Sequence, residues 1–268
     1  MRATALIRSS AFALAFGCTS VFSVLALAQA TQEAPASSST FQPTVGQEGK
    51  DVVWVPTPQA LVDKMLDMAN VTAKDYLMDL GSGDGRTVIT AAKRGAKAVG
   101  IEYNPNMVAL SRDNAKKAGV SDRAQFMKAD LFQTDLSKAS VITMFLLPDI
   151  NLKLRPKILQ LKPGTRVVSN TFTMGDWKAD ETGSPDNCDS SWCTALLWIV
   201  PARVAGTYKT PQGEVTLKQR FQMLSGTLRS EDRTVPIEGR VRGEEITLKA
   251  GGKEYHGHMN GKALELGS

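Results

Sequence analysis

The chain has 268 residues, 42% of them hydrophobic and 22% charged, and a formal net charge of +5. These proportions are ordinary for a globular protein and exclude a largely disordered chain. Lysine and arginine residues are dispersed among acids rather than gathered in the stripe typical of nucleic-acid-binding proteins. We therefore expect one sizeable domain with a smaller companion, and no nucleic-acid partner.

Residues 1–30 have the layout of a secretory signal peptide. Arg2 and Arg8 precede an apolar stretch that ends in the A-x-A cleavage site Ala28-Gln29-Ala30. An uncleaved membrane anchor and a lipoprotein modified at Cys18 are the alternatives. Because polar sequence follows the small residues of the cleavage site, we expect cleavage, a periplasmic or secreted protein, and no stable membrane span afterwards.

Two domains are predicted after a flexible linker at residues 31–50, which is rich in Ala, Ser, Thr, Gln and Pro. In the first, residues 51–200, strands and helices alternate. This alternation predicts a parallel sheet with right-handed crossovers and a ligand at the carboxyl ends of its strands. The expected strands are 76–80, 98–101, 124–129, 140–147 and 166–169, and the expected helices begin at Pro58, Thr87, Pro105 and Asn151.

The second predicted domain, residues 201–268, has β-rich segments separated by turns and no helical pattern. It predicts a small antiparallel β-meander that packs on the first domain or on a partner. The expected strands are 204–209, 214–219, 221–228, 235–241, 245–248 and 254–259.

A glycine-rich turn follows the strand at 76–80. Gly81, Gly83 and Gly85 stand at alternate positions before a helix, where positive φ values and close approach of a ligand both require glycine. Amide groups at the start of the helix would offer hydrogen bonds to a polar ligand. Glu102 ends the next strand 21 residues after Gly81, the distance at which an acid reaches ribose hydroxyls. The turn predicts a bound cofactor with an unphosphorylated ribose.

The turn, with Asp79 two residues before it, resembles motif I (D-x-G-x-G-x-G) of the class I S-adenosylmethionine-dependent methyltransferases. Residues 51–175 are further similar to small lysine methyltransferases related to the mitochondrial ATP-synthase c-subunit enzyme. This similarity rests on Val55-Pro56-Thr57-Pro58, Asp79 to Arg86, Ser111-Arg112, Asp130-Leu131 and Phe145-Leu146-Leu147-Pro148. It does not extend to the predicted meander.

The resemblance implies a Rossmann-like methyltransferase sheet and S-adenosyl-L-methionine as cofactor. It implies that Asp79 holds the amino group of the cofactor, Glu102 the ribose and Asp130 the adenine amino group. The full set of candidate cofactor-binding residues is Thr57, Asp79, Gly81, Ser82, Gly83, Gly85, Glu102 and Asp130. Capping of the following turn or helix is the alternative role for each strand-end acid.

Candidate acceptor residues follow the fourth and fifth strands. Pro148 and Asn151 stand where the family lines its acceptor, and Phe172 and Trp177 follow strand 166–169. Helix capping at 148–151 and simple burial of aromatic surface are the alternatives. No catalytic residue is assigned, because the cofactor supplies the reactive group and the protein has only to hold donor and acceptor in line.

Two pairs of residues bear on export and on metal binding. Cys188 and Cys193 are the only cysteines left after the signal peptide, and we expect them to form a disulfide in an oxidising compartment. His256 and His258 share one face of a strand without a third ligand nearby, so we expect an exposed polar face and no metal.

Two functions remain in view. The first is an exported methyltransferase that acts on an unidentified acceptor, either a protein lysine or a small molecule. The second is a non-catalytic envelope binding protein on a methyltransferase fold, because an exported enzyme must obtain a cofactor that is made in the cytoplasm. Intact Asp79, Gly81, Gly83, Gly85 and Glu102 favour the enzyme.

Overall fold

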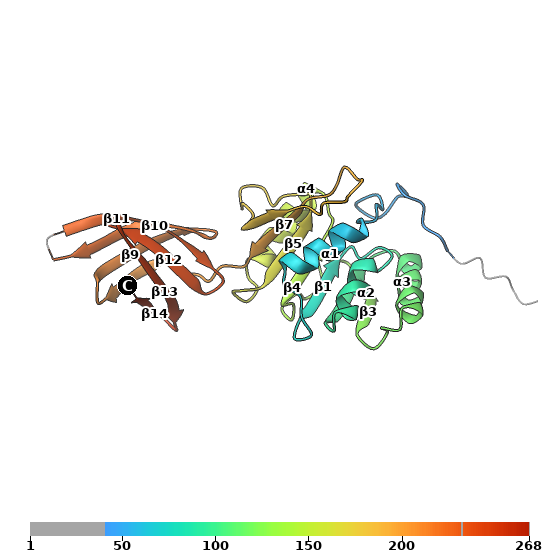
Figure 1. Ribbon diagram of the computed structural model, residues 1–268, viewed down its shortest axis with the longest axis horizontal. Helices are drawn as coiled ribbons and strands as arrows, with labels where there is room; N and C mark the ends of the chain where they lie inside the picture. The colour runs from blue at the N-terminus through green and yellow to red at the C-terminus, as the bar shows by residue number, and fades with distance from the viewer. Residues whose placement is uncertain (1–40, 232, 268) are drawn as a thin grey trace, which may run out of the picture. The chain divides into compact units, whose positions relative to one another are not determined.

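The computed structural model describes residues 41–231 and 233–267 (Figure 1). The predicted signal peptide and the first part of the predicted linker lie outside the described residues. Within the described part of the chain, no helix combines the length and the apolar character needed to cross a membrane.

The first part of the structure is a seven-stranded sheet with helices on both faces. Its helices are α1 (Gln59–Met68), α2 (Arg86–Lys93), α3 (Pro105–Lys117) and α4 (Pro148–Ile158). Its strands are β1 (Tyr76–Leu80), β2 (Lys97–Glu102), β3 (Ala124–Lys128), β4 (Val141–Met144), β5 (Arg166–Asn170), β6 (Glu181–Gly183) and β7 (Ala195–Ile199).

The strand order is β3-β2-β1-β4-β5-β7-β6, and β1 to β5 are parallel. The five predicted strands are parallel, as expected, but the sheet as a whole is mixed, because β7 pairs antiparallel with both β5 and β6. The apolar segment Ala195–Ile199 follows a long loop without a crossover helix, so the chain returns in the opposite direction. Neither β6 nor β7 was predicted from the sequence.

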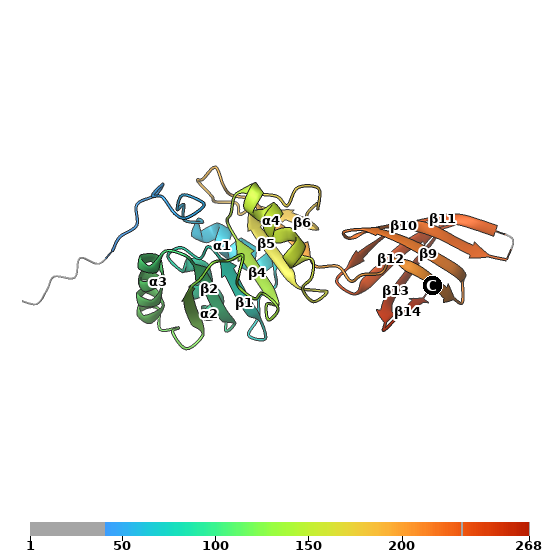
Figure 2. The same cartoon turned by 180° about the vertical axis from the view of Figure 1, so that it is seen from behind.

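The core forms two layers, one on each face of this sheet. Leu77 packs with α1, α2 and α3, whereas its neighbour Met78 packs with α4. Figures 1 and 2 show α1 and α4 on opposite faces. Successive strand residues point to opposite faces, so a sheet covered on both sides needs apolar residues at consecutive positions.

Leu66 of α1 is fully buried in this core. Its replacement by alanine would lower the free energy of unfolding by about 2–5 kcal/mol.

Helix α4 begins at Pro148, earlier than the predicted start at Asn151. Proline suits the first helical position because it has no N–H group to satisfy and its φ angle is already helical. Asp149 therefore lies in the first turn instead of capping the helix, and Leu147 occupies the cap position.

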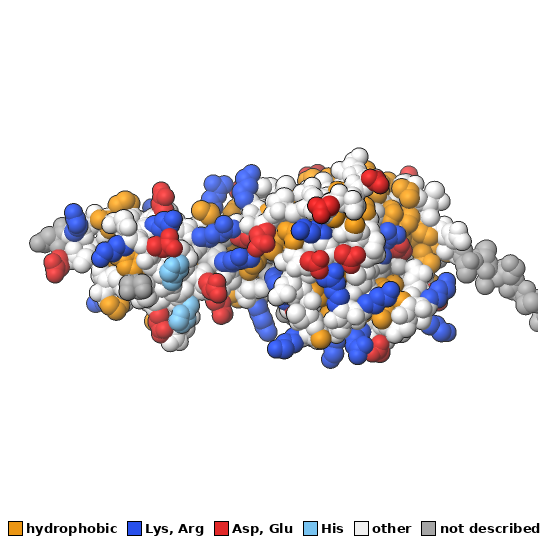
Figure 3. Space-filling view, viewed as in Figure 1, with side chains coloured by type: hydrophobic (Ala, Val, Ile, Leu, Met, Phe, Trp, Pro, Cys, Tyr) orange, Lys and Arg blue, Asp and Glu red, His pale blue; other side chains and the backbone are white. Residues whose placement is uncertain are grey.

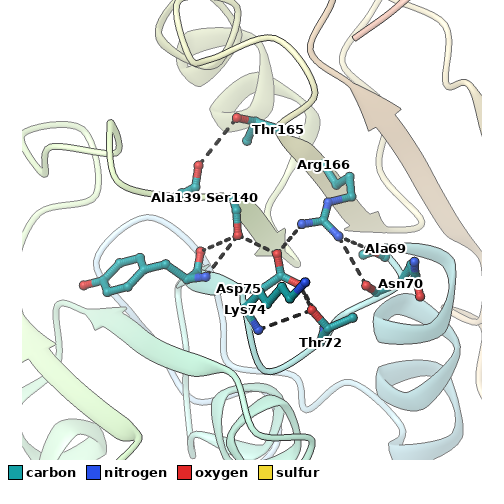
Figure 4. A network of polar contacts seen from close by, with 10 residues as sticks. Ala69, Asn70, Thr72, Lys74, Asp75, Ala139, Ser140, Thr165 and Arg166 are labelled. Carbon is teal, nitrogen blue, oxygen red and sulfur yellow. Dashed lines mark hydrogen bonds and ion pairs between the residues drawn. The ribbon is translucent and has the colours of Figure 1, made fainter. Parts of the chain in front are cut away.

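A polar network joins the amino ends of β1, β4 and β5 (Figure 4). The carboxylate of Asp75 accepts hydrogen bonds from the Thr72 amide at 2.8 Å and the Ser140 hydroxyl at 2.7 Å, and it pairs with Arg166. Arg166 also donates to the carbonyl of Ala69 at the end of α1, at 2.7 Å. Burial alone would raise the pKa of Asp75, but these hydrogen bonds and the guanidinium outweigh it and hold the pKa below its usual value.

The second part is a seven-stranded antiparallel sheet in sequential order, with its own apolar core. Sequence reasoning predicted the meander but missed its last strand. The two edge strands, β8 and β14, lie close together, so the sheet is barrel-like. Gln212, in the turn after β8, donates to the carbonyl of Leu266 in β14 at 3.3 Å. The strands are β8 (Gly206–Thr210), β9 (Gly213–Arg220), β10 (Met223–Ser230), β11 (Arg233–Arg242), β12 (Glu245–Ala250), β13 (Lys253–Asn260) and β14 (Ala263–Gly267).

Candidate functional site

A pocket lies at the carboxyl ends of the central strands of the first sheet. It holds about 1080 Å³ of space that is continuous with solvent. Its walls are the glycine turn after β1, the ends of β2 and β4, residues 129–131 after β3, and residues 47–57, here called the strap. The strand order reverses between β1 and β4, and ligands of open α/β sheets bind at such a point.

The glycine turn has the backbone geometry that its sequence requires. Gly81, Gly83 and Gly85 have φ angles of +77°, +54° and +83°. A Cβ atom on Gly83 would lie 2.7 Å from the Trp54 indole nitrogen of the strap. Gly81 and Gly83 line the pocket, whereas Gly85 packs under Phe126 and caps α2, so its role is in the turn.

The amides of the turn are committed to the protein itself. Those of Gly81 and Ser82 both donate to the carbonyl of Ile101, at 2.8 and 3.1 Å, and that of Gly83 donates to Glu102 at 3.0 Å. These three amides are therefore not available to a ligand. The hydroxyl of Ser82 is buried beside the pocket and has no hydrogen-bond partner among the described residues.

Asp79 is the penultimate residue of β1, and its pKa is shifted further than that of any other acid in the pocket wall. Its side chain is 6% exposed, and the Thr143 hydroxyl donates a hydrogen bond to it at 2.6 Å. Burial raises the pKa of Asp79 to about 7, with a smaller contribution from the negative charges of Asp84 and Glu102, against the opposing effect of Thr143. No basic side chain among the described residues forms an ion pair with it. Because Asp79 has no cationic partner within the described part of the protein, it can pair with the positively charged amino group of the cofactor.

Glu102 joins the end of β2 to the glycine turn. One carboxylate oxygen accepts from the Gly83 amide at 3.0 Å, and the other accepts from the Asn104 amide at 2.9 Å. Each oxygen has a second lone pair, so the carboxylate can still accept two hydroxyl donors. Glu102 therefore caps the turn, as in the alternative role, and its remaining lone pairs can also make the predicted contact with the ribose.

Asp130 follows β3, lines the pocket and contacts the strap. Its carboxylate pairs with Lys50 at 2.6 Å and accepts from the Phe132 amide at 2.8 Å. The Lys50 ammonium lies 4.6 Å from the centre of the Tyr103 ring. The hydrogen bond from Lys50 lowers the pKa of Asp130 and raises that of Lys50. Sequence reasoning missed Lys50 because it placed this residue in a flexible linker.

Thr57 lies where the strap enters α1 and is 8% exposed. Its carbonyl accepts from Arg86 at 3.0 Å, and Arg86 pairs with Asp84 at 2.6 Å. Asp84 and Arg86 were not singled out from the sequence, although both are part of the motif that carried the resemblance. They tie the strap to the glycine turn.

The four predicted acceptor residues lie outside the pocket walls. Pro148 begins α4, and Asn151 is fully buried and donates to the carbonyls of Phe172 and Thr173, each at 3.2 Å. Trp177 is fully buried against Phe221, so burial accounts for it and removes it from the candidate site.

Phe172 remains close to the pocket. Its ring stacks on that of Phe145 with centroids 5.8 Å apart, and Phe145 lines the pocket. Phe145 was not among the predicted site residues, because in the sequence it is only one residue of the segment after the fourth strand.

The cysteine and histidine pairs lie apart from the pocket walls. Cys188 and Cys193 are disulfide-bonded, with Cα atoms 6.1 Å apart. His256 and His258 lie 3.2 Å from Glu254 and 3.3 Å from Glu265 on the exposed face of β13. Across residues 41–231 and 233–267, no group of three or more His, Cys, Asp or Glu side chains could hold a metal ion.

A Rossmann-like sheet, a glycine turn after its first strand, a buried acid before the turn and a second acid after β2 define a class I methyltransferase whose cofactor is S-adenosyl-L-methionine. Comparisons with known proteins agree. The family model of the ANTKMT methyltransferase domain matches residues 79–181. A protein-lysine N-methyltransferase of Saccharolobus islandicus is 47% identical over 133 residues, which cover 48% of this chain and 83% of that protein.

Two further relatives extend the comparison. The ATP synthase c-subunit lysine N-methyltransferase of Mus musculus is 36% identical over 140 residues, which cover 52% of this chain and only 56% of that enzyme. The crystal structure of an RNA methyltransferase from Salinibacter ruber in complex with S-adenosyl-L-homocysteine is 49% identical, with a TM-score of 0.52 over 56% of this chain and 96% of that one.

The chain belongs to the ANTKMT-type family of S-adenosylmethionine-dependent methyltransferases. It is an enzyme, and the alternative of a non-catalytic binding protein is not retained.

Proposed function

We propose that the chain transfers a methyl group from S-adenosylmethionine to the side-chain nitrogen of a lysine in a protein acceptor. The observation that carries the proposal is the position of Phe145 in the same pocket as Asp79 and Glu102, which provides an apolar wall beyond the cofactor-binding acids. The relatives from Saccharolobus islandicus and Mus musculus, whose names specify lysine as the acceptor, support it.

The cofactor supplies a methyl group on a sulfonium, so no residue has to activate the donor. The protein has to orient the two reactants and exclude water. Asp79 would hold the amino group, Glu102 the ribose and Asp130 the adenine, while Trp54 of the strap covers Gly83.

The acceptor nitrogen must arrive neutral, because its lone pair forms the new carbon–nitrogen bond as the carbon–sulfur bond breaks. No histidine lines the pocket in the described part of the chain. The lysine ammonium loses one proton to water before the transfer. The methylated nitrogen then carries the positive charge that the sulfonium gives up, so each transfer to an ammonium releases one proton.

RNA is the second candidate acceptor, because the relative from Salinibacter ruber is named as an RNA methyltransferase. Phosphate contacts dominate nucleic-acid binding and require clustered basic residues. In this chain acids are mixed with the bases, and Asp63, Asp67, Asp84 and Asp130 each pair with a basic side chain. This distribution favours a protein acceptor.

We further propose that the enzyme is exported to the periplasm or secreted. The proposal rests on the signal-peptide layout of residues 1–30 and on the Cys188–Cys193 pair, because disulfides persist in oxidising compartments. Protein recovered from the periplasm should show no reactive thiol after unfolding. Two reactive thiols, or recovery in the cytoplasm alone, would contradict export.

The test of acceptor class is a labelling experiment. The purified protein is incubated with S-adenosylmethionine labelled in the methyl group and, separately, with envelope proteins, with RNA and with a small-molecule extract. We expect label in the protein fraction, as methyl-lysine after complete hydrolysis. Label confined to RNA or to small molecules would overturn the lysine proposal.

A further inference from the structure

Three aromatic side chains form a cluster that starts at the pocket wall, where Phe145 contacts the other two rings. Phe145 follows β4 and lines the pocket. Phe172 follows β5, and its ring stacks on Phe145 with centroids 5.8 Å apart. Phe145 also contacts Trp192. The centroids of these two rings are 6.1 Å apart and the ring planes are tilted by 58°. We call these three residues the aromatic rim.

Phe172 is held by its backbone instead of by burial of its ring. Its carbonyl accepts hydrogen bonds from Ser169 at 2.7 Å and from Asn151 at 3.2 Å. The preceding residue, Thr171, has a φ angle of +60°, which is rare for a β-branched residue. Backbone strain of this kind concentrates at functional sites, where the surrounding contacts enforce it.

Trp192 is held by the disulfide. It lies between Cys188 and Cys193 in a short closed loop and is 37% exposed. In Figures 1 and 2 the loop before β7 and the segment before α1, which lines the cofactor pocket, lie at the same end of the α/β part. Figure 3 shows hydrophobic side chains gathered at this end. An exposed tryptophan on a cross-linked loop beside a pocket is placed to contact a ligand.

Two acids lie in this loop or just before it. Asp186 and Asp189 are exposed, and within the described part of the chain neither forms an ion pair. The acids that precede them differ, because Asp176 pairs with Arg155 and Arg220, and Asp180 pairs with Arg240. The two carboxylates leave a negative field beside the aromatic rim, which attracts a cationic peptide.

We propose that the aromatic rim is the subsite for the acceptor lysine and that the Cys188–Cys193 loop carries its specificity. The aliphatic stem of the lysine packs against the surface that the rings of Phe145, Phe172 and Trp192 form together, which directs its nitrogen into the pocket. Asp186 and Asp189 favour acceptors with basic residues beside the lysine. This inference rests on the proposed lysine methylation and adds the residues and the flanking chemistry that select the acceptor.

The Trp192 ring could have a structural role or a binding role, and the kinetics of a variant distinguish the two. If the ring only packed on Phe145, its removal would lower the melting temperature and leave kinetics unchanged. As part of the subsite, its removal raises the KM for the acceptor and leaves cofactor affinity intact. Opening the disulfide would have the same effect, because it releases the loop that holds Trp192.

The experiment uses the full chain and short acetylated peptides with a single lysine, flanked by arginine, alanine or glutamate. Trp192→Ala is compared with wild type and with Met223→Ala, a matched control at an exposed apolar residue of β10. Methyl transfer is measured for each peptide, and binding of S-adenosylhomocysteine is measured by calorimetry. The wild type is also assayed after reduction with dithiothreitol, and Phe172→Leu serves as the second variant if Trp192→Ala does not fold.

We expect the wild type to prefer the arginine-flanked peptide. We expect Trp192→Ala and the reduced wild type to raise KM about tenfold with unchanged binding of S-adenosylhomocysteine. Asp186→Asn with Asp189→Asn should remove the preference for arginine flanks. Unchanged KM in both Trp192→Ala and the reduced enzyme would overturn the subsite and leave lysine methylation standing. Binding of S-adenosylhomocysteine without methylation of any peptide by the wild type would contradict the proposed function and the subsite together.

Discussion

The hydroxyl of Thr143 on β4 donates a 2.6 Å hydrogen bond to the buried carboxylate of Asp79, its direct partner on β1. This single donor does not offset the cost of burying a charge, so the pKa of Asp79 rises to about 7. Asp79 is the residue predicted to hold the amino group of the cofactor. Cofactor binding and the ionisation of Asp79 are therefore coupled.

Affinity for S-adenosylhomocysteine should rise about tenfold between pH 5.5 and pH 7, because the ligand's ammonium group stays protonated over this range and needs ionised Asp79 as its partner. Calorimetry across this range measures the effect. Asp79→Asn should bind weakly at every pH, without this dependence. A wild-type affinity that does not change over the range would separate Asp79 from the ligand.

The same residue should destabilise the enzyme when no ligand is bound. A pKa raised from 3.8 to about 7 means that the folded state holds the proton more tightly than the unfolded state. The free energy of unfolding should therefore fall as pH rises from about 4 to about 7. Asp79→Asn should be more stable than wild type at pH 8 by on the order of 2–4 kcal/mol. Urea titration at pH 4 and pH 8 checks this, and a variant less stable than wild type at pH 8 would contradict it.

Replacement of Glu102 by alanine should weaken binding of S-adenosylhomocysteine by about 1–3 kcal/mol, because a hydrogen-bonded charged group is lost and the Gly83 amide is released. Glu102→Gln keeps one acceptor oxygen and should lose less. Calorimetric titration of both variants gives the comparison. Equal affinities for wild type and Glu102→Ala would remove this carboxylate from the site.

The network in Figure 4 should control stability at acid pH. The pKa of Asp75 is lowered in the folded state, so its stabilisation is present above its ordinary pKa and is lost as pH falls through the lowered value. Arg166→Ala should reduce the free energy of unfolding at pH 7 by about 2–3 kcal/mol and shift acid unfolding to higher pH. Arg123→Ala is the control, because its pair with Asp122 at 3.5 Å is exposed. If both variants lost the same free energy of unfolding, the network around Asp75 would contribute no stability beyond that of an exposed ion pair.

Local spacing and the resemblance were enough to bring Asp79, Gly81, Gly83 and Glu102 together in one predicted site, and all four line the pocket. Asp79, the glycine turn and Glu102 lie within two adjacent strand–turn units, where the chain itself fixes their separation. The structure brings Asp130 to the same pocket because β3 is parallel to β2. The positive φ angles of the turn follow from glycine at those positions.

The rest of the pocket depends on contacts between distant residues. Lys50 meets Asp130 across 80 positions, and nothing near either residue indicates the pairing. Phe145, Phe172 and Trp192 come from three separate segments. The antiparallel return of the chain at β7 decides where the loop that carries Trp192 lies, and strand alternation alone did not predict that return.

The measurement that tests lysine methylation most directly is tandem mass spectrometry of envelope proteins after incubation with the full chain and S-adenosylmethionine. Asp79→Asn serves as the inactive control. We predict that fragment ions place added methyl groups on lysine side-chain nitrogens, in wild-type reactions only. Unmodified lysines beside a wild-type enzyme that binds its cofactor, or methyl groups on another residue type, would contradict the proposal.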